Sequence, residues 1–137
     1  MNMAEPLHFD TTGLRGRMLV REPMAQHTSW RAGGHADLAY VPADLADLQA
    51  FLRALPPAEP VLLVGLGSNL LVRDGGFRGT AILLHDTRGT MRVEGELVYA
   101  AAGVASPKVA RFAAIHGYEG AEFLAGILSG AHVITPV

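Results

Sequence analysis

The chain of 137 residues contains no cysteine, which excludes disulfides, iron–sulfur clusters and thiolate chemistry. It also lacks an excess of charge, because 11 Lys and Arg face 13 Asp and Glu for a net charge of −2. That balance does not favour nucleic acid or an anionic membrane surface as a partner. The absence of cysteine suits a reducing compartment, and we expect the protein to be cytoplasmic.

Long apolar runs are missing as well. No segment approaches the roughly 20 apolar residues that span a bilayer, and the N-terminal region has no apolar stretch of the signal-peptide kind. The six histidines do not fall at ligand spacing, so no metal site is expected. What the sequence does have is 50% hydrophobic residues, enough for the core of one domain.

Hydrophobic spacing predicts a first unit of strands and one helix. Apolar residues between 42 and 55 recur at helical intervals, and Pro42 is placed at the start of that helix. A strand before the helix and a strand after it imply a parallel pair. Residues 1–24 show no clear pattern and are expected to be a loose leader. The expected strands are 36–41, 61–64, 70–72 and 80–84.

A second unit begins near Thr90. Residues 91–99 flank Gly95 and predict a hairpin. Ser106 is expected to cap a helix with Pro107 in its first position, and Gly117 is expected to end it.

The most informative segment is a glycine loop, residues 65–69, which follows the apolar run Val61–Val64 directly. We expect that run to be a strand covered on both faces. Glycines let a ligand approach the main chain, and successive N–H groups in such a turn form a nest for phosphate. No helix follows and no Lys is present, so neither a Rossmann fingerprint nor a Walker loop fits. The structural alternative is a glycine-rich hairpin between two core strands.

Three segments together carry a family resemblance: HTSWRAGGHADLAYVP from His27, VGLGSN from Val64, and AAAGVASPKVARFAAIHGYEGAEFLAGI from Ala100. In order and spacing they resemble the N-terminal flavin-binding region of the UDP-N-acetylenolpyruvoylglucosamine reductases, also called UDP-N-acetylmuramate dehydrogenases. This family belongs to the vanillyl-alcohol-oxidase-like (PCMH-type) flavoproteins. The resemblance extends from about His27 to Ile127.

The resemblance implies an α+β fold of two small α/β lobes with FAD between them, the second lobe being incomplete. It divides the chain into a leader (1–26) and an FAD-binding domain (27–137), with lobes at about 36–84 and 90–127 and a divergent tail at 128–137. The implied reaction is NADPH-dependent reduction of UDP-N-acetylglucosamine enolpyruvate in peptidoglycan precursor synthesis. Flavin would carry the redox chemistry.

The resemblance also implies cofactor-binding residues. In the family the glycine loop holds the FAD pyrophosphate, and Gly65, Gly67, Ser68 and Asn69 match its pattern position by position. Arg31 is a candidate phosphate contact, with an exposed loop charge as the alternative.

Four further positions have weaker assignments. Tyr40 and Val41 match a segment near the adenosine half of FAD, with packing of a strand end as the alternative. Ala102 and Gly103 match a strand of small residues that lies against the cofactor, with tight strand packing as the alternative.

After Ile127 the sequence departs from the family pattern, since the expected proline and glycine pair are missing. The family's catalytic residues and its binding site for the UDP-sugar substrate lie beyond this point, so no catalytic residue is assigned. A truncated, frame-shifted, deliberately shortened or naturally short homologue would all end in this way, and we expect the short chain to be inactive in the family reaction. Two other functions fit the glycine loop: a different PCMH-type flavoprotein oxidase and a non-catalytic nucleotide-binding module.

Overall fold

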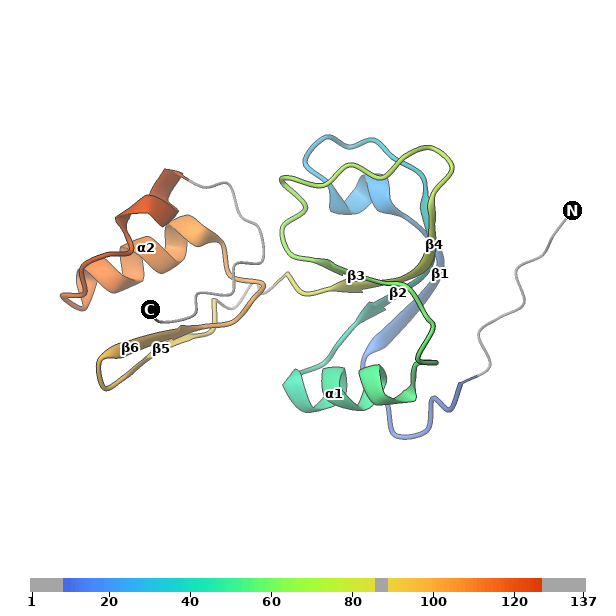
Figure 1. The fold of residues 1–137 in the computed structure, drawn as a ribbon, viewed down its shortest axis with the longest axis horizontal. Helices are drawn as coiled ribbons and strands as arrows, with labels where there is room; N and C mark the ends of the chain where they lie inside the picture. The colour runs from blue at the N-terminus through green and yellow to red at the C-terminus, as the bar shows by residue number, and fades with distance from the viewer. Residues whose placement is uncertain (1–8, 86–88, 127–137) are drawn as a thin grey trace, which may run out of the picture.

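Two groups of secondary-structure elements make up the residues that a computed structural model describes, 9–85 and 89–126 (Figure 1). The mixture confirms the α+β class, while the division into cofactor-binding lobes stays a prediction. The first group contains β1 (Arg17–Pro23), η1 (Met24–His27), β2 (His35–Val41), α1 (Leu45–Ala54), β3 (Val61–Val64) and β4 (Phe77–Leu83). The second contains β5 (Met91–Glu94), β6 (Leu97–Ala100), α2 (Ser106–Ile115) and η2 (Glu122–Gly126).

The first group is built on a four-stranded sheet in the order β1-β2-β4-β3. β4 is parallel to β2 and to β3, whereas β1 is antiparallel to β2. In the centre, Ala81 of β4 pairs with Ala39 of β2 and with Leu62 of β3. β2 and β3 therefore run in the same direction, as predicted from the helix between them, but they do not pair directly because β4 lies between them.

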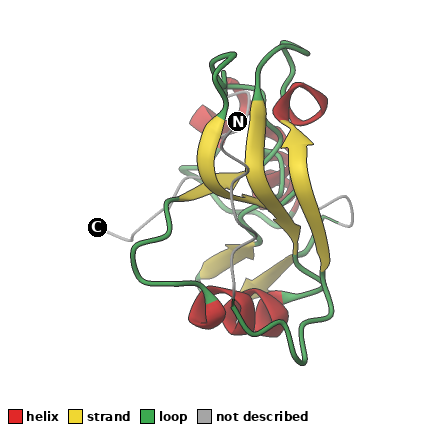
Figure 2. Cartoon of the chain, turned by 90° about the vertical axis from the view of Figure 1, so that its right-hand side faces the viewer, coloured by secondary structure: helices red, strands yellow, loops and turns green. Residues whose placement is uncertain are grey.

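Each face of this sheet carries a cluster of buried apolar side chains. Side chains alternate along β4, so that Ala81 and Leu83 join one cluster and Ile82 joins the other. α1 covers the Ile82 face (Figures 1 and 2), where the Phe51 ring stacks on Tyr40 with ring centroids 3.8 Å apart. The helical spacing of apolar residues in the sequence thus correctly predicted the helix that covers this face of the sheet.

β3 is an edge strand and differs from the expectation of a strand buried on both faces. Val61 is 41% exposed and Leu63 is 53% exposed, whereas Val64 is buried. A short apolar run in the sequence cannot distinguish an edge strand from an inner strand of the sheet. Residues 70–72 were also expected to form a strand, but they contribute only an isolated bridge from Val72 to Gly33.

The expectation of an irregular leader is wrong for residues 17–24. β1 pairs with β2 along its length, from Arg17 opposite Val41 to Pro23 opposite His35. Met24 is fully buried in the core. Most of β1 is exposed, and for this reason it lacks the apolar alternation that would have revealed it. The sheet therefore crosses the boundary expected between residues 26 and 27.

α1 begins at Leu45 and not at the predicted Pro42, because Asp44 is its N-cap and accepts a hydrogen bond from the N–H of Asp47 at 2.9 Å. The buried carboxylate of Asp47 accepts three hydrogen bonds, from Arg15 N at 2.7 Å, Ala43 N at 2.9 Å and the Tyr40 hydroxyl at 2.8 Å. This carboxylate fastens the segment before β1 and the start of α1 to the end of β2.

The second group contains the predicted hairpin and helix, with one correction. β5 and β6 pair antiparallel around the turn at Gly95, and Gly117 ends α2 with a φ of +78°. The N–H of Tyr118 donates to the carbonyl of Ala113, as in a Schellman motif. The expected Ser106 cap is wrong, because Ala105 is the N-cap and the buried Ser106 is the first helical residue. No helix within the described residues is long and apolar enough to cross a membrane.

We expect Asp47→Asn to lower the free energy of unfolding by about 2–4 kcal/mol, because an amide offers one acceptor oxygen to three donors. Burial tends to raise the pKa of Asp47, but its hydrogen bonds outweigh this and hold the pKa below its ordinary value. A lowered carboxyl pKa stabilises the fold above the ordinary Asp pKa, and this contribution is lost as the pH falls through the folded-state value. Urea unfolding between about pH 7 and pH 3 should show a weaker acid dependence in the variant.

Asp44→Asn is the matched control. Asn caps helices as well as Asp does, and the ion pair that Asp44 forms with Arg15 is exposed on both sides. Its stability should stay close to that of the wild type. Equal losses in the two variants would contradict the special role of Asp47.

Candidate functional site

Two loops lie side by side at one end of the sheet. The first, which we call the histidine loop, covers residues 27–34, from the last residue of η1 to the start of β2. The second continues from the glycine loop toward β4 (Figure 1). The N–H of Ser29 donates to the carbonyl of Gly67 at 3.0 Å, and farther along Gly33 bridges Val72 in parallel. These contacts join the two loops before either reaches its next strand.

Gly67 is required by the contact between the loops. It has a φ of +67°, and a Cβ built on it would lie 1.7 Å from the carbonyl oxygen of His27. Only glycine permits that approach. Gly67 is therefore explained by packing alone, without any ligand.

Gly65 has a different environment. The nearest atom to a Cβ built there is the carbonyl oxygen of Ala102, at 3.9 Å, which is an ordinary contact distance. Apart from its two chain neighbours, no atom of the first group lies within 4 Å of that Cβ position. Packing therefore does not require a glycine at position 65, and the space beside it is open. Ala102, from the second group of elements, lies close to this position.

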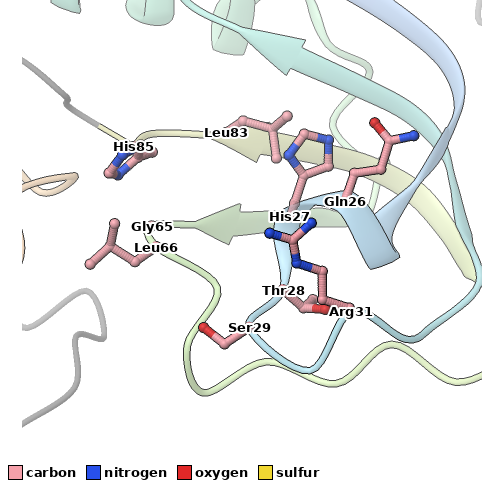
Figure 3. A pocket seen from close by; sticks show the side chains of 9 residues that line it. All are labelled: Gln26, His27, Thr28, Ser29, Arg31, Gly65, Leu66, Leu83 and His85. Atoms are coloured by element: carbon pink, nitrogen blue, oxygen red, sulfur yellow. The ribbon is translucent and has the colours of Figure 1, made fainter.

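A cavity of about 470 Å³ opens at the carboxyl ends of β3 and β4 (Figure 3). This is the edge of a parallel sheet at which ligands bind in open α/β folds. The residues around it come from the histidine loop and its preceding turn, from the glycine loop, and from the end of β4. They are Gln26, His27, Thr28, Ser29, Arg31, Gly65, Leu66, Leu83 and His85.

The charges around the cavity suit an anion. Arg31, His27 and His85 line it, and no carboxylate is found among the described residues of the lining. Figure 3 shows the side chains of Arg31, His27 and His85 among those that line the cavity. Glu22 of β1 contacts the His27 ring, with its Oε1 2.7 Å from His27 Nε2. Among the described residues, no three His, Asp or Glu side chains gather as a metal site.

The histidine loop holds Arg31 in an unusual conformation. Its φ is +53°, a left-handed value that is uncommon outside glycine. The N–H of Arg31 donates to the carbonyl of Thr28 at 3.2 Å, and the buried Thr28 hydroxyl donates to the carbonyl of Ala32. These bonds tie the loop together on either side of Arg31 and keep its side chain at the cavity.

The structure brings some of the predicted site residues to the cavity. Gly65 and Arg31 line it, whereas Gly67, Ser68 and Asn69 lie in the adjoining turn and are not part of its lining. Four further lining residues were not predicted from the sequence: His27, Thr28, Ser29 and His85. The HTS triplet at the start of the first resembling segment was the available signal for three of them.

The remaining predicted positions lie elsewhere. Tyr40 is buried in the core under α1, and its hydroxyl accepts from Gly16 N and donates to Asp47. Its side chain therefore has the packing role given as the alternative. Val41 is half-buried and packs against the opposite core cluster. Ala102 and Gly103 form a turn after β6 and not the expected strand, because the N–H of Val104 donates to the carbonyl of Ala101 at 2.9 Å.

Comparisons with known proteins agree with the resemblance in the sequence. The UDP-N-acetylenolpyruvoylglucosamine reductase of Alkalilimnicola ehrlichii is 59% identical over 82% of this chain, and that of Nitrosospira multiformis is 54% identical over 93%. The crystal structure of the corresponding reductase from Thermus caldophilus matches 83% of the chain with a TM-score of 0.60 and 27% identity. The chain spans 38% of the length of each of these proteins. No family model matches it.

The two glycines should respond differently to substitution. In Gly67→Ala the positive φ costs about 1–3 kcal/mol, and the overlap with His27 adds to that loss. Gly65→Ala should leave stability within about 1 kcal/mol of the wild type, because its Cβ would enter open space. Urea unfolding of both variants tests this, and equal tolerance of alanine at the two positions would refute the packing role of Gly67.

Proposed function

Because most of the chain is homologous to part of the UDP-N-acetylenolpyruvoylglucosamine reductases, we propose that it is the FAD-binding portion of such an enzyme. The cavity carries the proposal, since it combines an open glycine with cationic side chains at the carboxyl edge of a parallel sheet. A pyrophosphate at this edge would satisfy both features. The relatives favour this reductase over other flavoproteins of the same fold.

The residues present fit FAD in three respects. Gly65 leaves its main chain accessible from the cavity. Arg31 supplies a permanent positive charge there, and guanidinium groups bind phosphate oxygens in a defined geometry. The carbonyl of Ala102 approaches Gly65 from the second group, so a ligand at the cavity would reach both groups of elements.

We assign the glycine loop, residues 65–69, to the pyrophosphate, with Gly65 as the direct contact and Gly67 as the residue that holds the loop in place. Ser68 and Asn69 extend the loop as further hydrogen-bonding groups. Ala102 and Gly103 would border the cofactor from the turn after β6. For Tyr40 any contact with the adenosine half of FAD would come from the backbone, since its side chain is buried in the core and its hydroxyl donates to Asp47. The side chain of Val41 packs on the other core cluster, so the same is proposed for it.

The proposed reaction belongs to the whole protein of which this chain matches a part. When bound, FAD would accept hydride from NADPH and transfer it to the enolpyruvyl double bond of the UDP-sugar substrate. The part of this chain is to bind and orient the cofactor. Arg31 and the glycine loop would hold the pyrophosphate of FAD at the edge of the sheet.

We expect the purified chain to bind FAD and Gly65→Val to weaken that binding by about tenfold or more, because a branched side chain would fill the approach to the main chain. Quenching of flavin fluorescence measures the affinity. Gly75→Val is the matched control, because the φ of Gly75 lies outside the left-handed region and no atom lies within 4 Å of its Cβ position. The control should bind FAD like the wild type.

Two results would count against the proposal. A wild-type chain that is folded and yet binds no FAD would remove the cofactor assignment. Unchanged FAD affinity in a folded Gly65→Val variant would show that the pyrophosphate lies elsewhere.

A further inference from the structure

His27 is held from both ends in the wall of the cavity. Its carbonyl oxygen lies against Gly67. Two residues farther along the chain, the N–H of Ser29 donates to the Gly67 carbonyl. Its ring is fixed by the 2.7 Å contact between Nε2 and Oε1 of Glu22. Both side chains are largely covered, with 26% of His27 and 14% of Glu22 exposed. The ring therefore has a fixed place in the cavity wall.

The contact with Glu22 determines what the other ring nitrogen offers. An ionised carboxylate only accepts hydrogen bonds, so Nε2 carries the hydrogen that faces Glu22. In the neutral ring Nδ1 is then an acceptor with a lone pair, and in the protonated ring it is a donor with a positive charge. A phosphate oxygen is repelled by the first form and attracted by the second.

We propose that His27 is a specificity-determining residue whose protonation is coupled to binding of a pyrophosphate group in the cavity, with Glu22 as its positioning residue. The inference rests on the proposed function, which supplies a pyrophosphate as the ligand. Coupling is reciprocal: an anion that binds better to the protonated ring makes the ring bind its proton more tightly. Binding of FAD should therefore take up a proton from solvent.

Among the described residues, Glu22, Arg31 and His85 face the His27 ring or share its cavity. The Glu22 carboxylate approaches from β1, Arg31 comes from the same loop, and His85 comes from the end of β4. A bound pyrophosphate adds negative charge beside the ring, and this favours the protonated ring.

The test is calorimetric titration of the chain with FAD in two buffers of different protonation enthalpy, between about pH 6 and pH 8, where histidine changes charge. ADP-ribose serves as a second probe, because it carries the same pyrophosphate diester without a flavin. Neither diester exchanges a proton in this range, so any uptake belongs to the protein. We expect net uptake with both probes and an affinity that falls by up to about tenfold per pH unit as the pH rises.

His27→Gln should abolish the His27-dependent uptake and flatten the pH profile, because an amide cannot take up a proton. His35→Gln is the control and should keep that uptake, since His35 is exposed on β2 and does not line the cavity. Glu22→Gln should move the fall in affinity to lower pH, because it removes the negative charge beside the ring; a merely structural role of Glu22 would leave the profile in place. Retention of the wild-type uptake in His27→Gln would overturn the inference.

The two proposals can fail separately. FAD binding without proton uptake would overturn the role of His27 and leave the FAD assignment intact. If ADP-ribose binds with uptake and FAD does not bind, the flavin assignment fails and the coupling at His27 stands. If neither probe binds, both fail.

Discussion

The close approach of the His27 carbonyl to Gly67 is the contact on which the site depends. It brings two connections of the sheet together at the carboxyl ends of β3 and β4, where a cavity can form. A side chain at position 67 would force the histidine loop away from the glycine loop. The His27 ring, the turn that holds Arg31 and the open backbone at Gly65 all lie next to this contact. Their mutual placement follows from a single position at which no Cβ is present.

Much of the fold could be predicted from local pattern. The helical spacing of Phe51 and Leu55 identified the helix that covers one face, and Gly95 and Gly117 marked a hairpin turn and a helix end. These signals work because each depends on a few neighbouring residues. β1 carried no such signal, since an exposed edge strand has little need of apolar alternation. Its place in the sheet is set by the partner strand β2, which a local pattern cannot reveal.

The candidate site was only partly predictable for a related reason. Glycine in a loop can serve a ligand or a close chain contact, and the two uses look alike in sequence. Gly67 serves the contact and Gly65 stays open, a distinction that depends on where His27 lies in space. The importance of His27 and His85 likewise arises from connections that are distant in sequence and meet at one edge of the sheet. Arg31 was named because of its charge, but its left-handed backbone came only with the structure.

The strand order β1-β2-β4-β3 also has a consequence for how the chain folds. β4 is an inner strand and the last of the four in sequence, so the place between β2 and β3 stays empty until β4, which ends at Leu83, is available. During synthesis the first hairpin-like pair, β1 with β2, can form early, while the parallel ladders must wait for a distant segment. Pairings between such distant segments slow folding, because the intervening chain is ordered before the contacts form. The insertion of β4 is therefore the step at which the sheet, and with it the cavity edge, becomes a single cooperative unit.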